Sequence, residues 1–174
     1  MKAVEAMYAR KVDLTQADLV ERLVYEPATG LFHWRAAVSR SIRPGDIAGG
    51  RTSLGYTTIK ICRSRYMAHR LALLYVHGAW PAGEIDHING DKTDNRMENL
   101  RDVDVRINQE NRRGLQANNQ SGAMGVCWSK KKRKWNASIT VHKKHVHLGT
   151  FDDIEAASAA YLAAKRAMHE GCTI

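Results

Sequence analysis

One stretch, residues 84–101, restricts the fold of this chain more than any other, and it reads EIDHINGDKTDNRMENLR. Its middle holds Gly90 and several Asn and Asp side chains, and such a run cannot form a core helix or strand. We therefore predict a long polar loop held between two short strands, EIDH (84–87) and NLRDV (99–103). Asp104 can then cap a short helix that follows the second strand. The expected unit is strand, loop, strand and helix.

Regular elements are expected on both sides of this loop. Before it, the pattern predicts a helix over 14–24, a strand over 31–34, a hairpin of strands 57–61 and 65–68, and a helix over 69–78 that ends at a glycine. After it, the pattern predicts strands over 124–128, 134–141 and 145–151, and then a helix capped by Asp152 together with Glu155. Residues 114–123 are small and polar, which indicates a linker.

The charge balance indicates a polyanionic partner. The 174 residues carry a formal net charge of +9, and no acidic residue lies between Glu110 and Asp152. Such a balance favours nucleic acid first and an anionic membrane second. No apolar run is long enough to span a membrane, so no membrane partner is expected. The three cysteines form no CxxC pair, which fits a reducing cytosol and argues against a zinc ribbon.

The polar loop and its flanks hold side chains suited to phosphodiester hydrolysis. Asp86 and Asn108 offer carboxylate and amide oxygens, the hard ligands that magnesium prefers. His87, beside Asp86, can take a proton from water at neutral pH when its imidazole is neutral. A base for the water and a cation for the charge on phosphorus are what this reaction requires. The alternative is a polar surface loop with a helix cap, but the spacing and the flanking elements agree with a site.

The motif and its surroundings resemble the HNH homing endonucleases of the branch common in phages. The resemblance rests on EIDHINGDKTDNRMENLR, on the preceding MAHRLALLYVHGAWP and on VYEPATGLFHW further upstream, and it covers roughly residues 14–113. The family fold is the ββα-metal finger. The resemblance implies a DNA endonuclease that uses one divalent metal ion, with magnesium favoured and manganese possible, since an Asn ligand favours these ions over zinc.

Carried over by position, the resemblance also implies roles for single residues. His87 is the general base and Asp86 is a metal ligand. Asn99 is the middle Asn of the motif, whose side chain braces the loop and holds the orientation of the histidine. Asn108 stands where the family has its last His and becomes the second metal ligand, and Asn111 is the competing candidate.

Two residues at the start of the helix over 69–78 could also serve the site. Arg70 could touch a phosphate group of DNA. His69 is interpreted mainly as a helix-start residue, with a catalytic role as the less favoured alternative.

The last third resembles the plant ethylene-response-factor (APETALA-type) DNA-binding domain, which also occurs fused to HNH nucleases. The resemblance rests on MGVCW, KWNASI and HLGTFDDIEAASAAY and covers about residues 122–170. Cys127 and Ser129 stand where the plant domains have base-contacting arginines, so plant target sequences do not transfer. Trp135 is expected in the core, and Trp128 is left open between the core and the DNA backbone.

Alternation along KWNASITV separates an apolar face from a polar one. The apolar face should receive the terminal helix, and the polar face should lie on DNA. The predicted DNA contacts of this part are Arg112, Arg113, Lys130, Lys132, Arg133, Lys134, Asn136, Ser138, His145 and His147.

The predicted fold class is α+β, with a ββα-metal (HNH) nuclease domain and a small three-stranded antiparallel sheet packed on one helix. The domains are expected at 1–113, with the motif core at 84–111, and at 124–174, joined by the linker at 114–123. The predicted function is cleavage of double-stranded DNA by a monomer, encoded by a phage or mobile element and acting in the cytoplasm of a bacterial host. One alternative is a DNA-binding transcriptional regulator with an inactive nuclease fold, and a weaker one is a basic RNA-binding protein.

Overall fold

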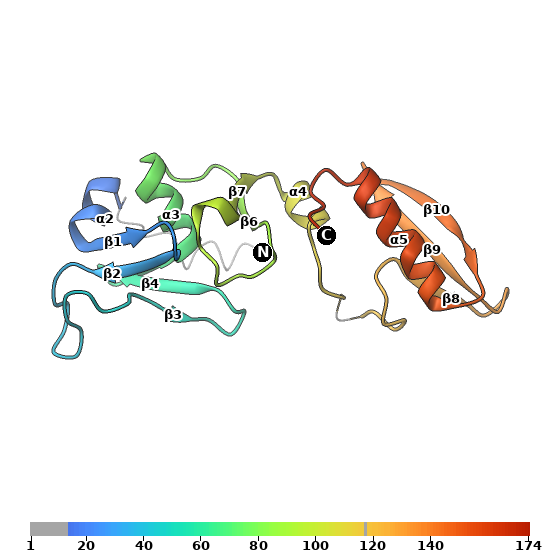
Figure 1. Cartoon of the computed structure of the whole chain (residues 1–174), viewed down its shortest axis with the longest axis horizontal. Coiled ribbons are helices and arrows are strands. Elements are labelled where there is room, and N and C mark those ends of the chain that lie inside the picture. Colours follow the sequence, from blue (N-terminus) through green and yellow to red (C-terminus); the bar gives the residue numbers. More distant parts are fainter. Residues whose placement is uncertain (1–13, 117) are drawn as a thin grey trace. The chain divides into compact units, whose positions relative to one another are not determined.

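The computed structural model describes residues 14–116 and 118–174, and it combines helices with antiparallel sheets, as the sequence predicts. Contacts divide the chain into two compact units, which are separated between Val103 and Asp104 (Figure 1). This division lies upstream of the predicted linker at 114–123. No helix in the described ranges is both long enough and apolar enough to cross a membrane.

The first unit opens with helix α2 (Gln16–Arg22) and the hairpin of β1 (Leu23–Glu26) and β2 (Leu31–Trp34). A capping box begins α2, because the Thr15 hydroxyl accepts from the Asp18 amide and the Asp18 carboxylate accepts from the Thr15 amide. The predicted helix over 14–24 is too long at its end. Leu23 is buried and Val24 is exposed, so burial alternates with the period of a strand from this point.

A second sheet and a helix build most of the remaining core of this unit. Strands β3 (Gly50–Arg51), β4 (Thr57–Ile61) and β5 (Ser64–Met67) lie in that order. Helix α3 (Ala68–His77) follows directly and ends at Gly78, whose φ of 76° is left-handed. The largest fully buried side chains of this core are Phe32, Leu19, Leu23, Ile59, Leu71 and Leu74.

The polar segment folds as the predicted strand–loop–strand hairpin. Strand β6 (Glu84–His87) pairs antiparallel with β7 (Leu100–Val103), and a short 3₁₀ turn, η1 (Met97–Asn99), leads into β7. Ile85 of β6 and Leu100 of β7 belong to the hydrophobic core, so both strands are anchored to the core of the first unit. The nine residues between His87 and Met97 carry almost all of the polar contacts described below.

The second unit contains α4 (Val105–Glu110), the sheet of β8 (Val126–Ser129), β9 (Lys134–Val141) and β10 (Lys144–Phe151), and helix α5 (Ile154–Met168). The strands lie in the order β10–β9–β8, and α5 packs across one face of the sheet (Figure 1). Ala137 and Ala157 are fully buried where helix and sheet meet. This is the predicted three-stranded antiparallel sheet on one helix.

The start of α5 differs from the prediction. Asp153, not Asp152, is the N-cap, since its carboxylate accepts from the Ala156 amide at 2.7 Å. Asp152 instead forms an ion pair with Lys134 Nζ at 2.8 Å. Near the other end Met168 is 43% exposed while Lys165 is 2% exposed. The Lys165 ammonium is buried because it donates to the Arg112 carbonyl, which ties the segment after α4 to α5.

Helix α4 is fixed within the second unit by the last residues of the chain. The buried Glu110 carboxylate accepts from Arg106 Nη1 and from the Gly171 amide, each at 3.0 Å. Arg106 Nη2 also donates to Glu170 at 2.8 Å. The Thr173 hydroxyl donates to Asn111, which is buried. The short helix therefore obtains its stability from tertiary contacts rather than from its own length.

Candidate active site

The predicted catalytic pair lies at the end of β6, where the strand gives way to the polar loop. Asp86 and His87 are each 5% exposed, although both are polar. Asn99, at the end of η1, is also buried and faces the same loop. Asn108 lies half-buried on α4, in the second unit. Buried polar groups need partners, so the contacts of each side chain show what holds it in place.

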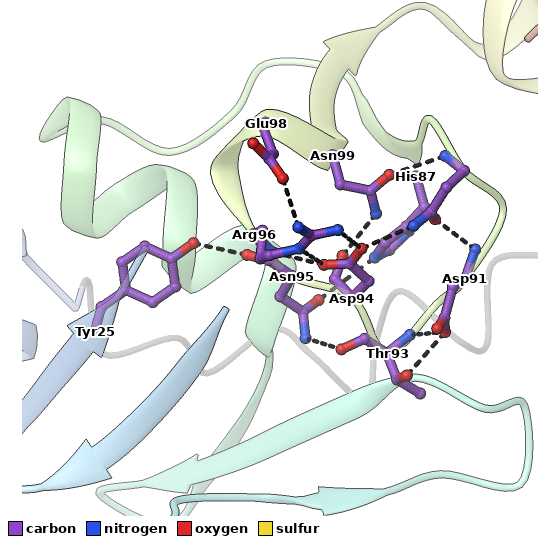
Figure 2. A network of polar contacts seen from close by, with 10 residues as sticks. Tyr25, His87, Asp91, Thr93, Asp94, Asn95, Arg96, Glu98 and Asn99 are labelled. Atoms are coloured by element: carbon purple, nitrogen blue, oxygen red, sulfur yellow. Dashed lines mark hydrogen bonds and ion pairs between the residues drawn. The ribbon is translucent and has the colours of Figure 1, made fainter. Parts of the chain in front are cut away.

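Asn99 braces the loop from inside (Figure 2). Its Oδ1 accepts from the Asn89 amide at 2.8 Å, and its Nδ2 donates to the Asp94 carbonyl at 2.8 Å. One side chain thereby joins the beginning of the loop to its far end. The Ile88 amide adds a bond to the Asn99 carbonyl at 2.9 Å. The middle of the motif thus has a fixed backbone path, and the catalytic assignment of Asn99 stays a prediction.

A charged pair stiffens the far end of the loop. Arg96 donates from Nε and Nη2 to the two carboxylate oxygens of Asp94, both at 2.8 Å, and from Nη1 to Glu98 at 2.5 Å (Figure 2). The hydrogen bonds from Arg96 lower the pKa of Asp94 to about 2, so this carboxylate stays ionised. Gly30 packs against the same backbone, and a Cβ there would lie 2.5 Å from the Arg96 nitrogen. The hairpin of β1 and β2 therefore supports the loop at close range.

Asn95 sets the orientation of His87, and sequence reasoning missed it. Its Nδ2 donates to the Thr93 carbonyl at 3.2 Å, which directs its Oδ1 toward His87 Nε2 at 3.4 Å (Figure 2). An oxygen can only accept, so this arrangement assigns the imidazole proton to Nε2 and the lone pair to Nδ1. Tyr25 holds Asn95 in turn, donating its hydroxyl to the Asn95 carbonyl at 2.7 Å.

The local environment keeps His87 neutral. Burial lowers its pKa, while the bond to Asn95 and the carboxylates of Asp86, Asp91 and Asp94 oppose that shift without reversing it. A neutral imidazole with a defined tautomer can accept a proton at physiological pH.

His69 lies against His87, although the sequence favoured a plain helix-start role for it. The two ring centroids are 5.2 Å apart, edge to face, and the Tyr56 ring contacts both. Burial, together with positive charge on His87 and Arg70, lowers the pKa of His69 to about 3. Within the described ranges its buried Nδ1 has no hydrogen-bond partner. The signal in the sequence was a histidine at the start of the helix that precedes the motif.

Arg101 is a second residue that sequence reasoning missed. It stands directly opposite Asp86 in the pairing of β6 with β7, and its Nε and Nη2 donate to Asp86 Oδ2 at 2.8 and 2.7 Å. The buried carboxylate thus has a cationic partner, as a buried charge requires. Strand register could have suggested this pair, because the two residues occupy opposed positions once His87 is aligned with Leu100.

The described residues offer few side chains that could hold a metal ion. In the described part of the chain, no group of three or more His, Cys, Asp or Glu side chains could enclose a metal ion. The loop amides of Asn89, Asn95 and Asn99 bind the loop itself. Asp86 therefore remains the principal oxygen donor of the first unit. Magnesium keeps several waters and binds phosphate oxygens, so it needs few protein ligands.

Some of the predicted DNA-contacting residues bond to other parts of the protein, and others are exposed. Arg70 is half-buried and donates to the Pro81 and Gly83 carbonyls at 2.9 and 3.0 Å, which fixes the turn after α3. Arg113 donates to Thr173, and Lys134 is paired with Asp152. The remaining predicted cationic contacts of the second unit are exposed: Arg112, Lys130, Lys132 and Arg133. No contact with DNA is tested by these bonds, so all stay predictions.

The sheet of the second unit brings the predicted polar contacts together. Ser138 is opposite His147 and Thr140 is opposite His145, so these side chains share one face of β9 and β10. Asn136 lies on the same face and accepts from the Thr150 hydroxyl at 3.0 Å. Both histidines are exposed.

Comparison with known proteins supports a nuclease domain in the central segment. A family model described as HNH endonuclease matches residues 66–110, which include α3, the hairpin of β6 and β7 and α4. No curated protein and no solved structure matches the chain.

Proposed function

From the match of residues 66–110, we propose that this chain is a DNA endonuclease of the HNH type, in which His87 is the general base for phosphodiester hydrolysis. The observation that carries the proposal is the setting of His87. It is buried at the end of β6, with Nε2 directed at an asparagine oxygen whose own orientation is set by Thr93. A side chain that merely filled space would not need a defined tautomer.

His87 acts through Nδ1. With the proton held at Nε2 by Asn95, the Nδ1 lone pair can accept a proton from the attacking water. Asn99 and the Asp94–Arg96 pair keep the loop in place, so the imidazole does not need to reorganise during the reaction. The oxygen of the water then attacks phosphorus as its proton passes to the imidazole. The bond from phosphorus to the leaving ester oxygen breaks, and that oxygen takes a proton from solvent.

A divalent metal, magnesium or manganese, is the proposed cofactor, and Asp86 is its proposed ligand in the first unit. When bound, the ion supplies positive charge for the phosphate and for the leaving oxygen. Asn108, on α4, is the second ligand that the resemblance implies, and Asn111, which accepts a hydrogen bond from Thr173, is the competing candidate. Arg101 must share the Asp86 carboxylate with the ion or move from it.

The second unit is the proposed site-binding part. Its polar sheet face and exposed cations suit the grooves and phosphates of double-stranded DNA. We infer a homing-type enzyme encoded by a phage or mobile element, working as a monomer in the cytoplasm of a bacterial host. One active site in a monomer would nick DNA, whereas a dimer or sequential nicking would cut both strands.

The decisive experiment is conversion of supercoiled plasmid in magnesium, with and without EDTA. We expect nicked or linear product from the wild type and almost none from His87→Ala. His77→Ala is the matched control, because His77 is an exposed histidine at the end of α3. Equal cleavage by wild type and His87→Ala would show that His87 is not the base. Absence of cleavage by the wild type, on cognate DNA as well, would contradict the nuclease proposal.

A DNA-binding transcriptional regulator with an inactive nuclease fold is the second candidate. The observation in its favour is the ion pair of Arg101 with Asp86, which occupies the carboxylate expected to bind metal. Titration with manganese separates the two. A regulator of this kind would show no saturable manganese binding that depends on Asp86, whereas the nuclease would lose binding in Asp86→Asn.

A further inference from the structure

The first unit contains its own acid-poor stretch. Between Glu26 and Glu84 the sequence holds one acidic residue, Asp46, and eight Lys and Arg residues. The net charge of this stretch is positive, like that of the stretch between Glu110 and Asp152 in the second unit. Positive charge is therefore a property of both units.

Three of these cations gather on the hairpin of β4 and β5. Lys60 and Arg65 are direct cross-strand partners, and Arg63 lies in the turn that joins the strands. All three are exposed. Across the described ranges, no residue forms an ion pair or side-chain hydrogen bond with them. Like charges opposite each other weaken a strand pair, so this arrangement needs an explanation other than stability.

Strand alternation directs two of the cations away from the core. Ile59 and Tyr66, the pair next to Lys60 and Arg65, are buried against the core of the unit. Their neighbours Lys60 and Arg65 therefore stand on the outer face. Cross-strand partners have Cα atoms about 5 Å apart. The Lys60 ammonium and the Arg65 guanidinium can therefore reach neighbouring phosphates of one DNA strand.

The turn between β4 and β5 places Cys62 and Arg63 in a backbone conformation that such residues rarely adopt. Cys62 and Arg63 have φ values of 47° and 69°, in the left-handed region where Asn and Gly are preferred. The hairpin tips of the second unit repeat this feature, with Arg133 at φ 53° and Lys143 at φ 65°. Each of these three hairpin turns thus carries a Lys or Arg in a left-handed backbone conformation, which is unfavourable for such residues.

We propose that the β4–β5 hairpin is a binding surface for the phosphate backbone of duplex DNA, with Lys60, Arg63 and Arg65 as the contacts. The choice of DNA as ligand rests on the proposed function. Phosphate contacts carry no sequence information, so this surface would let the first unit bind a duplex of any sequence. Site preference then comes from the second unit alone.

The test is the salt dependence of binding by the full chain to a duplex of unrelated sequence, in the His87→Ala background so that the DNA stays intact. The triple variant K60Q/R63Q/R65Q should lower the slope of log Kd against log salt by about 0.9 for each lost phosphate contact, or about 2.7 in all. The matched control K60R/R63K/R65K keeps the charges and should keep the slope.

A second variant separates DNA contact from hairpin stability. C62N/R63G supplies residues that suit the left-handed turn, so it should raise the melting temperature while lowering the slope by about 0.9. Unchanged slopes in both variants would overturn the proposal. Plasmid cleavage by the wild type is measured alongside. Reduced slopes without wild-type cleavage would support the hairpin contact and contradict the nuclease, and cleavage with unchanged slopes would do the reverse.

Discussion

One pair of histidines in each unit shows how differently the two units surround this residue type. In the first unit His87 and His69 are buried, touch each other and have lowered pKa values. In the second unit His145 and His147 are exposed on the sheet face beside polar neighbours. The difference matches the task proposed for each pair. Moving a proton requires one fixed geometry and a controlled pKa, whereas binding a polyanion requires accessible groups that can adapt.

The largest expected effect is on the cleavage rate, when the proposed base is removed from the first pair of histidines. His87→Ala should lower the cleavage rate about 10²–10⁴-fold, which is the usual contribution of a general base. The double variant H145A/H147A should weaken DNA binding while leaving the rate at saturating DNA almost unchanged. Single-turnover cleavage with excess enzyme measures the rate, and a binding titration measures the affinity. A comparable loss of rate in both variants would remove the distinction between the two pairs.

The packing of α4 on the chain end gives the next largest effect. A Cβ at Gly171 would lie 2.1 Å from the Ile107 carbonyl oxygen, so Gly171→Ala should destabilise the second unit by about 2–3 kcal/mol. Gly114→Ala is the matched control, because nothing lies within 4 Å of a Cβ there. Thermal unfolding measures both. Equal melting temperatures would mean that the last residues do not hold α4.

The same packing affects a deletion that removes the sheet and α5 from the second unit but leaves α4. Deleting residues 120–174 is expected to weaken site preference more than intrinsic cleavage, if the units act separately. The deletion also removes Lys165 and Gly171, which bind the Arg112 carbonyl and Glu110. Cleavage of non-cognate DNA and binding to cognate DNA, measured together, would reveal which loss is greater. A larger loss of non-cognate cleavage would mean that α4 needs the rest of the second unit to keep its structure.

Arg101 offers a smaller test, on the electrostatics of the buried site. Arg101→Gln leaves the Asp86 carboxylate without its cation, and we expect a loss of about 2 kcal/mol in EDTA, less than for a fully buried pair because Arg101 is 27% exposed. Magnesium should recover part of this stability in the variant and less in the wild type. Thermal unfolding with EDTA and with magnesium tests this. An equal response to magnesium in both proteins would mean that Asp86 binds no metal.

The smallest effect near neutral pH concerns His69. Its pKa is about 3 when folded and about 6.5 when unfolded, so the unfolded chain takes up the proton first as pH falls. Stability from the neutral imidazole is therefore present above pH 6.5 and is lost progressively as pH falls from about 6.5 toward 3. His69→Gln should flatten this decline, and His77→Gln should not. Denaturant unfolding across this range checks it, and parallel curves for His69→Gln and wild type would contradict it.

Local patterns determined the elements and the position of the candidate site. The alternation in KWNASITV predicted β9 with its observed bounds, and a glycine marked the end of α3. The density of Asn, Asp and Gly after EIDH predicted the loop between β6 and β7. Such features depend on neighbours in the chain, because helix caps, strand alternation and turn conformations involve residues only a few positions apart.

Tertiary structure alone decided which side chains meet. The bond of Tyr25 to Asn95, the contact of His69 with His87 and the pairing of Arg101 with Asp86 join residues from different elements. The N-cap of α5 shows the same limit over a shorter distance. Asp152 and Asp153 carry the same side chain, and the ion pair of Asp152 with Lys134 distinguishes them in the folded sheet. The sequence by itself thus determined which chemistry is present and where, while folding decided how it is oriented, because orientation depends on contacts that chain neighbours do not supply.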